Sequence, residues 1–136
     1  MANEEDAQAL LTKIAYQDLE GLKGLIASGV DINAQDDMQG NTALIAACTY
    51  GFTDIAKYLI SEGADVDEAS DTGPGAGYTC LMMVARNANP ELVKFLLSKG
   101  ADINAKAKDG STALSLAMKE NEAKMVALLK ANGATE

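Results

Sequence analysis

The sequence predicts an all-α solenoid in which helix-turn-helix units, joined by hairpin-like loops, stack side by side. The interval of 21 positions from Thr42 to Gly63 recurs twice further along the chain, and successive closing glycines are 34, 37 and 33 residues apart. These glycines are Gly29, Gly63, Gly100 and Gly133. A period in this range indicates repeats that become stable only by stacking. We expect one domain over residues 1–136, with repeats at approximately 3–34, 35–67, 68–105 and 106–136.

The first unit opens with Asn3, a candidate helix cap followed by carboxylates at positions 4–6 that favour the positive end of a helix dipole. Apolar residues then recur at helical spacing up to about Tyr16, and again over residues 22–26. Gly29 is expected to end the second helix, because glycine adopts the left-handed conformation of a helix C-terminus without steric cost.

The second unit, Asn41–Asp67, is the template for the others: an inner helix, a turn at Gly51, an outer helix and a stop at Gly63. The apolar positions of units two to four are Leu44, Ala47, Cys48, Ile55, Ala56, Leu59, Ile60, Leu81, Val84, Ala85, Leu92, Val93, Leu96, Leu97, Leu114, Ala117, Val126, Leu128 and Leu129. Isolated helices below about 12 to 15 residues are marginal in water, so stacking must stabilise them. Polar residues on the outer surface of the last unit suit a terminal repeat and favour a complete protein.

Composition excludes several classes of function. The chain has no histidine, which excludes Ser-His-Asp and Cys-His catalysis and histidine-ligated metals. Cys48 and Cys80 lie in apolar helical patterns rather than a CxxC pair, so we expect buried, reduced thiols. Neither a targeting signal nor a run of roughly 20 apolar residues is present. We expect a soluble, cytoplasmic monomer without enzymatic activity, cofactor or metal.

Charge is unevenly distributed along the chain. Residues 1–72 carry 14 acids and 3 lysines, a net charge of -11, whereas residues 73–136 carry 6 acids and 8 bases, a net charge of +2. Such asymmetry steers a basic partner toward the first half. The chain lacks the basic stripe interleaved with aromatics that nucleic-acid binding requires, so no nucleic-acid partner is expected.

Two short motifs recur at matching positions. The first appears as Gly40 with Asn41-Thr42-Ala43-Leu44, Gly77 with Tyr78-Thr79-Cys80-Leu81, and Gly110 with Ser111-Thr112-Ala113-Leu114. The second appears as Gly29-Val30-Asp31-Ile32-Asn33, Gly63-Ala64-Asp65-Val66-Asp67 and Gly100-Ala101-Asp102-Ile103-Asn104. Over nearly the whole chain these motifs resemble the ankyrin repeat family, with its Thr-Pro-Leu-His and Gly-Ala-Asp-Val-Asn signatures. The resemblance implies four stacked repeats, of which the first and last act as caps.

The chain departs from the family signature at two positions in each of repeats two to four. Ala43, Cys80 and Ala113 replace the proline, and Ile45, Met82 and Ser115 replace the histidine. Proline presets the backbone of a first helical turn, and the family's histidine forms a hydrogen bond back to its threonine. We therefore expect repeats less stable than consensus ones, with an unchanged fold.

The lengthened loop 68–78 raises the alternative of anion or nucleotide binding. Gly73, Gly75 and Gly77 precede a helix, as in a phosphate-binding loop, but Tyr78 occupies the position of the required lysine. We expect a lengthened finger instead. The acidic cluster Asp65, Asp67, Glu68 and Asp71 lacks the spacing of a calcium loop and is expected to be a solvated edge with Asp65 in the turn. Met82, Met83, Met118 and Met125 are expected in the core.

The resemblance implies that partners dock on the concave side, formed by the hairpin fingers and the ends of the inner helices. The predicted partner-binding residues are Tyr16, Asp36, Met38, Gln39, Asn41, Thr49, Tyr50, Tyr78, Arg86, Asn87, Lys108, Ser111, Lys119 and Glu120. Tyr16 and Tyr50 occupy equivalent positions, so stacking should place them side by side with Tyr78 nearby. Tyrosine and arginine are enriched at binding hot spots, and Tyr50, Tyr78 and Arg86 are the expected anchors.

These observations predict a non-catalytic module that binds a protein partner, with the charge gradient setting the orientation of that partner. A more specific alternative is a stand-alone inhibitor or immunity-type protein that masks a basic toxin or enzyme. A small-anion or nucleotide site at the glycine-rich loop is the alternative from a different functional class.

Overall fold

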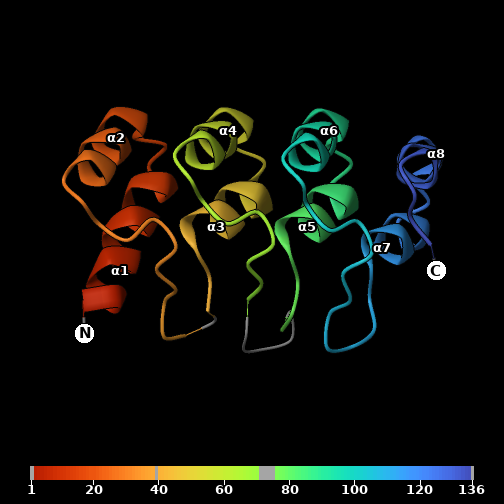
Figure 1. Ribbon diagram of the computed structural model, residues 1–136, viewed down its shortest axis with the longest axis horizontal. Coiled ribbons are helices and arrows are strands. Elements are labelled where there is room, and N and C mark those ends of the chain that lie inside the picture. The colour runs from red at the N-terminus through yellow and green to blue at the C-terminus, as the bar shows by residue number, and fades with distance from the viewer. Residues whose placement is uncertain (1, 39, 71–75, 136) are drawn as a thin grey trace.

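The computed structural model describes residues 2–38, 40–70 and 76–135, and these residues form four pairs of helices. The helices are α1 (Ala2–Ala15), α2 (Leu19–Ala27), α3 (Ala43–Tyr50), α4 (Thr53–Ser61), α5 (Cys80–Arg86), α6 (Pro90–Ser98), α7 (Ala113–Lys119) and α8 (Ala123–Ala131). The pairs stack side by side with α1, α3, α5 and α7 in an inner layer and the others in an outer layer (Figure 1). The predicted all-α repeat solenoid is thereby confirmed.

Threonine side chains define where the inner helices α3, α5 and α7 begin. The Oγ1 atoms of Thr42, Thr79 and Thr112 accept hydrogen bonds from the backbone N–H three residues later, at 3.2, 3.3 and 3.0 Å. In α7 the Ser115 hydroxyl also accepts from the backbone N–H of Thr112 at 2.8 Å, which completes a capping box. At this repeat, serine therefore restores a hydrogen bond to the cap that replacement of histidine was expected to remove.

The N-terminus of α1 differs from the prediction. Asn3 lies inside the helix, which begins at Ala2, rather than capping it. The acidic residues Glu4 and Glu5 nevertheless occupy its first turn, where they favour the helix dipole as expected. The first turns of α1 lie where a finger lies in the later repeats (Figure 1). From there, Glu4 Oε2 accepts a hydrogen bond from the backbone N–H of Asp37 in the second finger, at 2.6 Å.

The core runs continuously through the stack and consists of small and branched apolar side chains. Cys48 and Cys80 are both fully buried, as predicted, and are free thiols. They lie next to each other, and a hydrogen bond to Cys48 together with burial raises the pKa of the Cys80 thiol. Met82 and Met125 are buried as expected, but Met118 is 42% exposed, because α7 has no following repeat to cover it.

A ladder of side-chain-to-backbone hydrogen bonds links the loops that follow the outer helices. Three acceptors lie one repeat before their donors: Asn33 Oδ1 with Asp65 N, Asp67 Oδ1 with Asp102 N, and Asn104 Oδ1 with Thr135 N, at 2.9, 2.8 and 2.9 Å. In the first repeat, Asp6 Oδ2 of α1 takes the place of the preceding loop and accepts from Asp31 N at 2.8 Å. Within each loop, Asp31, Asp65 and Asp102 accept from the N–H two residues later, each at 3.0 Å. This loop ladder sets the spacing between repeats, and it includes the turn role predicted for Asp65.

The hairpin-like fingers also contact each other. An antiparallel bridge joins Ala69 to Thr79 in the third finger, and Lys108 N of the fourth finger donates to Ala76 O of the third at 3.2 Å. Gly77 has a φ of 85°, and a Cβ there would lie 2.9 Å from Lys108 N and 3.0 Å from Ala107 Cα. Glycine is required at this position both for the backbone conformation and for the close approach of the next finger.

We predict that Gly77→Ala is more destabilising than Gly110→Ala. Gly110 has a φ of 86° but open space around the Cβ position, so its substitution tests the left-handed conformation alone, at about 1–2 kcal/mol. Gly77→Ala adds a clash with backbone, and we expect at least about 1 kcal/mol more. Urea unfolding of both variants measures the difference. Equal midpoints would contradict a tight contact between the third and fourth fingers.

The loop ladder needs a hydrogen-bond acceptor at residue 67 but not a charge. We expect Asp67→Ala to lower the free energy of unfolding by about 0.5–1.5 kcal/mol, because Asp102 N loses its partner. Asp67→Asn is the matched control, since Asn33 and Asn104 occupy the equivalent position in neighbouring repeats. Thermal or urea unfolding should place the asparagine variant close to the parent. A loss as large as that of the alanine variant would show that the charge matters instead.

Candidate protein-binding surface

The most exposed large hydrophobic residues mark one candidate surface. Tyr16 is 81% exposed, Met38 80% and Tyr50 64%, whereas the other large apolar residues are largely covered, apart from Met118. Tyr16, Met38 and Tyr50 are all among the residues predicted to bind a partner. Exposed aromatic side chains of this kind are the usual anchors of protein interfaces.

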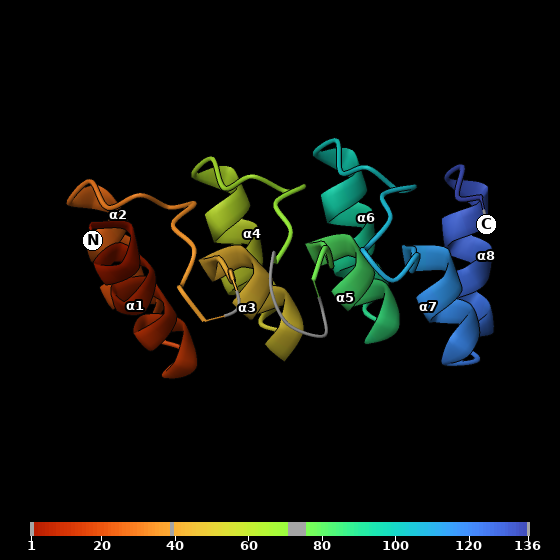
Figure 2. The same ribbon diagram turned by 90° about the horizontal axis from the view of Figure 1, so that it is seen from below.

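The ends of the inner helices share one edge of the stack. Figure 2 shows α1, α3, α5 and α7 side by side, all ending at the lower edge of that view. The predicted residues at or just beyond these ends are Tyr16, Thr49, Tyr50, Arg86, Asn87, Lys119 and Glu120, and each of them is exposed. We call this set the inner-helix edge. Its residues come from all four repeats, so one extended partner could contact them together.

The predicted finger residues have different roles. Asp36 and Asn41 close the second finger, because Asp36 N donates to Asn41 O at 3.0 Å and Asn41 N donates to Asp36 Oδ1 at 3.1 Å. Met38 lies between them and is exposed, whereas Gln39 lies outside the described residues. Lys108 is exposed on the fourth finger. The second finger is therefore a closed turn that presents Met38 to solvent.

Tyr78 joins the third finger to the fourth. Its hydroxyl lies 3.2 Å from Asp109 Oδ2 and 3.4 Å from Ser111 Oγ, and the ring is half-buried. Hydrogen bonds from the backbone and hydroxyl of Ser111, with a smaller contribution from Tyr78, hold the pKa of Asp109 below its ordinary value. Tyr78 thus has a structural task in addition to the binding role predicted for it.

The aromatic contact at the edge differs from the one expected. Among the described residues the ring pair in contact is Tyr50 with Phe52, at 5.6 Å between centroids and 32° between planes, and Tyr16 forms no ring contact with Tyr50. Sequence reasoning did not single out Phe52. The signal available in the sequence was an aromatic residue at the position before α4. At the equivalent positions Asp18 and Asn89 cap α2 and α6 with their side chains, and Glu122 before α8, like Phe52, forms no side-chain cap.

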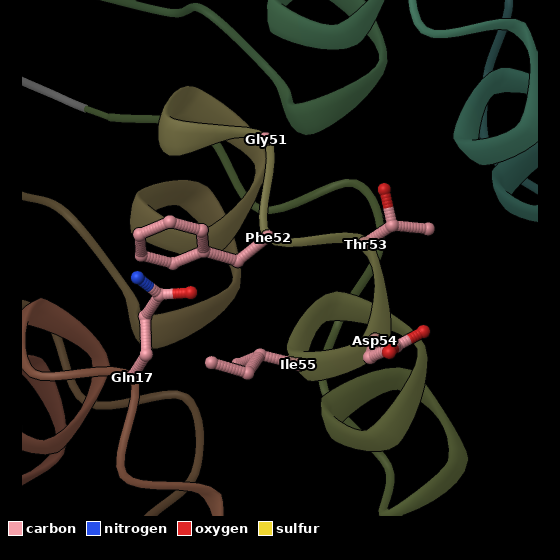
Figure 3. Close-up of a pocket in the computed structure, with 6 residues that line it drawn as sticks. All are labelled: Gln17, Gly51, Phe52, Thr53, Asp54 and Ile55. Atoms are coloured by element: carbon pink, nitrogen blue, oxygen red, sulfur yellow. The ribbon is translucent and has the colours of Figure 1, made fainter.

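A shallow hollow of about 270 Å³ lies beside this ring pair, between the first and second repeats. In Figure 3 the Gln17 amide lies under the Phe52 ring and Ile55 points into the same space, while Thr53 and Asp54 turn to the other side. Gln17 has a φ of 53° where Gly51 is the equivalent residue of the next repeat. On the side of Gln17 the hollow therefore has an aromatic and aliphatic lining with one amide, and Thr53 and Asp54 form its other border.

No group of side chains in the described part of the chain is arranged to hold a metal ion. Asp65 and Asp67 of the acidic cluster are members of the loop ladder, and Asp71 lies outside the described residues. The glycines at 73 and 75, on which the anion-binding alternative depends, also lie outside them. Over the described ranges, no helix has the length and apolar character needed to cross a membrane.

Stacked helix pairs with projecting fingers and an exposed edge are typical of repeat proteins that bind other proteins. The family model described as ankyrin repeats (3 copies) matches residues 10–107 and 68–135. The chain belongs to the ankyrin repeat family, whose members are protein-protein interaction modules.

Several curated proteins are similar to this chain. Mouse protein phosphatase 1 regulatory subunit 27 is 46% identical over 65 residues, which cover 48% of this chain and 42% of that protein. The chicken nuclear factor NF-kappa-B p105 subunit is 36% identical over 99 residues, covering 67% of this chain and 10% of that protein. Rat ankyrin repeat and SAM domain-containing protein 6 is 35% identical over 91 residues, which cover 67% of this chain and 10% of that protein. Each match spans less than half of the relative's length.

The hydrogen bonds around Asp109 predict an ordered series of pKa values. Ser111→Ala should raise the pKa of Asp109 more than Tyr78→Phe, because the Ser111 hydroxyl contributes more to lowering it than Tyr78 does. The lowered pKa means that this carboxylate contributes stability above its unfolded-state pKa, and loses it as the pH falls through the folded-state value. NMR titration of the Asp109 side chain measures the shifts. A larger shift in Tyr78→Phe would make the tyrosine the main stabiliser of the carboxylate.

Proposed function

We propose that this protein binds a basic protein partner through the inner-helix edge and the adjoining concave, finger-bearing face. The observation that carries the proposal is the exposure of Tyr16 and Tyr50 at the ends of adjacent inner helices. Arg86 ends the next inner helix, so the two hot-spot residue types lie on neighbouring repeats of the same edge.

Charge supports a basic partner. Residues 1–72 carry a net charge of -11, and residues 73–136 carry +2. A partner with a basic patch would set that patch against the first two repeats, where complementary charge speeds association and fixes orientation. The proposal takes the protein as a cytoplasmic monomer with two reduced thiols in its core.

A narrower form of the proposal is a stand-alone inhibitor or immunity-type protein that masks a basic enzyme or toxin. The acidic half motivates it, and one relative is named as a regulatory subunit of a phosphatase. In this form, binding covers the partner's functional surface, and the partner loses activity when the complex forms.

We predict that the double substitution Tyr50→Ala with Arg86→Ala weakens partner binding by about tenfold or more, which is at least about 1.4 kcal/mol. Affinity capture from the native host supplies the partner, and calorimetry with the purified pair measures the dissociation constant and the one-to-one ratio.

Lys94→Ala serves as the control, because it removes an exposed cation from the outer helix α6. Unchanged affinity in a folded double variant would move the binding site away from the inner-helix edge. Retained activity of a captured enzyme within the complex would reject the inhibitor form.

A further inference from the structure

The edge is built differently at the first and second junctions between repeats. Between repeats two and three, Asn87 Nδ2 donates to Thr49 O at 3.2 Å and Asn89 Nδ2 donates to Thr53 Oγ1 at 3.1 Å. These two bonds fasten the edge of the third repeat to the second. One repeat earlier, counting back from the closing glycine of each unit, the equivalent positions are Tyr50 and Phe52.

Tyr50 and Phe52 cannot form the side-chain hydrogen bonds that Asn87 and Asn89 form at the next junction. Asn89 also caps α6 through Oδ1, which accepts from Leu92 N at 3.2 Å, whereas α4 has no side-chain cap from Phe52. The Tyr50–Phe52 pair replaces these bonds with a ring contact beside the hollow, and places Tyr50 largely in solvent. Positions that break a local structural rule are where a binding role is expected.

Elsewhere in this chain, the half-buried rings of Tyr58 and Phe95 have lysine side chains over them. Lys23 lies 5.6 Å from the centre of the Tyr58 ring, and Lys57 and Lys99 lie 5.4 and 5.5 Å from the Phe95 ring. These contacts use the attraction between a cation and the face of an aromatic ring. Among the described residues, no lysine or arginine lies over the rings of Tyr16, Tyr50 and Phe52, although the contact of Lys23 with Tyr58 belongs to the same junction between the first two repeats.

One unpaired carboxylate borders the hollow of the first junction. Asp54 has neither a hydrogen-bond nor an ion-pair partner among the described residues, and its side chain lies on the opposite border from Gln17 and Ile55 (Figure 3). Asp18 and Glu20 of the first repeat are instead paired with Lys13 and Lys23, at 3.5 and 3.4 Å. An unpaired carboxylate beside a hollow lined by the Phe52 ring, in a half of the chain with a net charge of -11, favours a positively charged side chain.

We propose that Tyr16, Tyr50, Phe52 and Asp54 form a site for an arginine or lysine side chain carried by a basic, extended segment of a partner protein. The cation lies against the ring faces as Lys57 lies against Phe95, and the adjacent hollow receives the aliphatic part of the same segment. This inference rests on the proposed function and assigns its binding determinant to the junction between the first two repeats.

A hexa-arginine peptide tests the site directly, with hexa-citrulline as the neutral probe of nearly the same shape. Two-dimensional NMR of the whole chain should show saturable shifts centred on residues 16, 17, 50, 52 and 54 with the arginine peptide and none with the citrulline peptide. Shifts spread evenly over the acidic loops would reject the site in favour of general charge attraction. Equal shifts with both peptides would reject a cation as the ligand.

Tyr50→Asn with Phe52→Asn is the decisive variant, because it installs the asparagine pair of the next junction. Circular dichroism and thermal unfolding report whether the fold is kept, and the arginine peptide should then bind at least about tenfold more weakly. Tyr50→Phe with Phe52→Tyr keeps two rings and should bind like the parent. If the asparagine variant is unfolded, Asp54→Asn provides the second measurement, with a smaller loss expected; an unchanged affinity there would overturn the proposal.

The same variants separate this inference from the proposed function. A partner captured from the native host should bind the ring-exchanged variant and lose affinity for the asparagine variant. If the partner binds the asparagine variant normally but loses affinity for Lys108→Glu on the fourth finger, the protein remains a binding module and the first-junction site is wrong. If neither change alters binding to the partner, the site is likewise rejected.

Discussion

Burial of apolar side chains between neighbouring repeats is the interaction on which the whole structure depends. The helices of repeats two to four contain only seven to nine residues, and helices of that length are not stable alone. Each therefore needs the next repeat to cover its inner face. The two fully buried thiols Cys48 and Cys80 lie at such a junction, and the exposure of Met118 at the end of the stack shows what happens to the same face when no repeat follows. Stability in this arrangement is shared between neighbours rather than held by one central core.

Apolar contact alone does not determine how far each repeat is rotated or shifted against the next. The loop ladder fixes this geometry on one side, since Asn33, Asp67 and Asn104 each accept from the backbone N–H of the loop one repeat later. Contacts between fingers supply it on another side, through Lys108 N with Ala76 O and through the Tyr78 hydroxyl. Directional hydrogen bonds of this kind specify geometry even when each contributes little net stability. The result is a scaffold that can hold exposed side chains at defined spacings.

Most of the fold follows from the sequence because its signals are local and repeated. The closing glycines do adopt positive φ values, from 89° to 98°, and the threonine caps begin the inner helices. The side-chain ladder, the pairing of Cys48 with Cys80 and the bonding of Tyr78 were not predicted, because each depends on which residues of different repeats come to lie opposite each other. Tyr16 and Tyr50 were expected to lie side by side. Both are exposed at the ends of adjacent inner helices, and the ring contact that Tyr50 makes is with Phe52 of its own repeat. The partner-binding residues therefore remain predictions of position, with their exposure as the observation that supports them.

Departures from the repeat pattern are more informative about function than the pattern itself. A residue that agrees with its equivalents in other repeats is explained by the needs of the stack, as Thr42 and Asn33 are. Phe52 is not explained in this way, because Asp18 and Asn89 cap their helices at the equivalent position, and Glu122, which like Phe52 gives no side-chain cap, is not aromatic. Tyr50 likewise replaces the asparagine that fastens the next junction. Tyr16 is the equivalent of Tyr50 in the first repeat, so the exposed tyrosine is shared by the two repeats of the more acidic half and Phe52 is the departure beside it. Exposed aromatic side chains gathered in that half are better accounted for by an external cationic partner than by any contact within the solenoid.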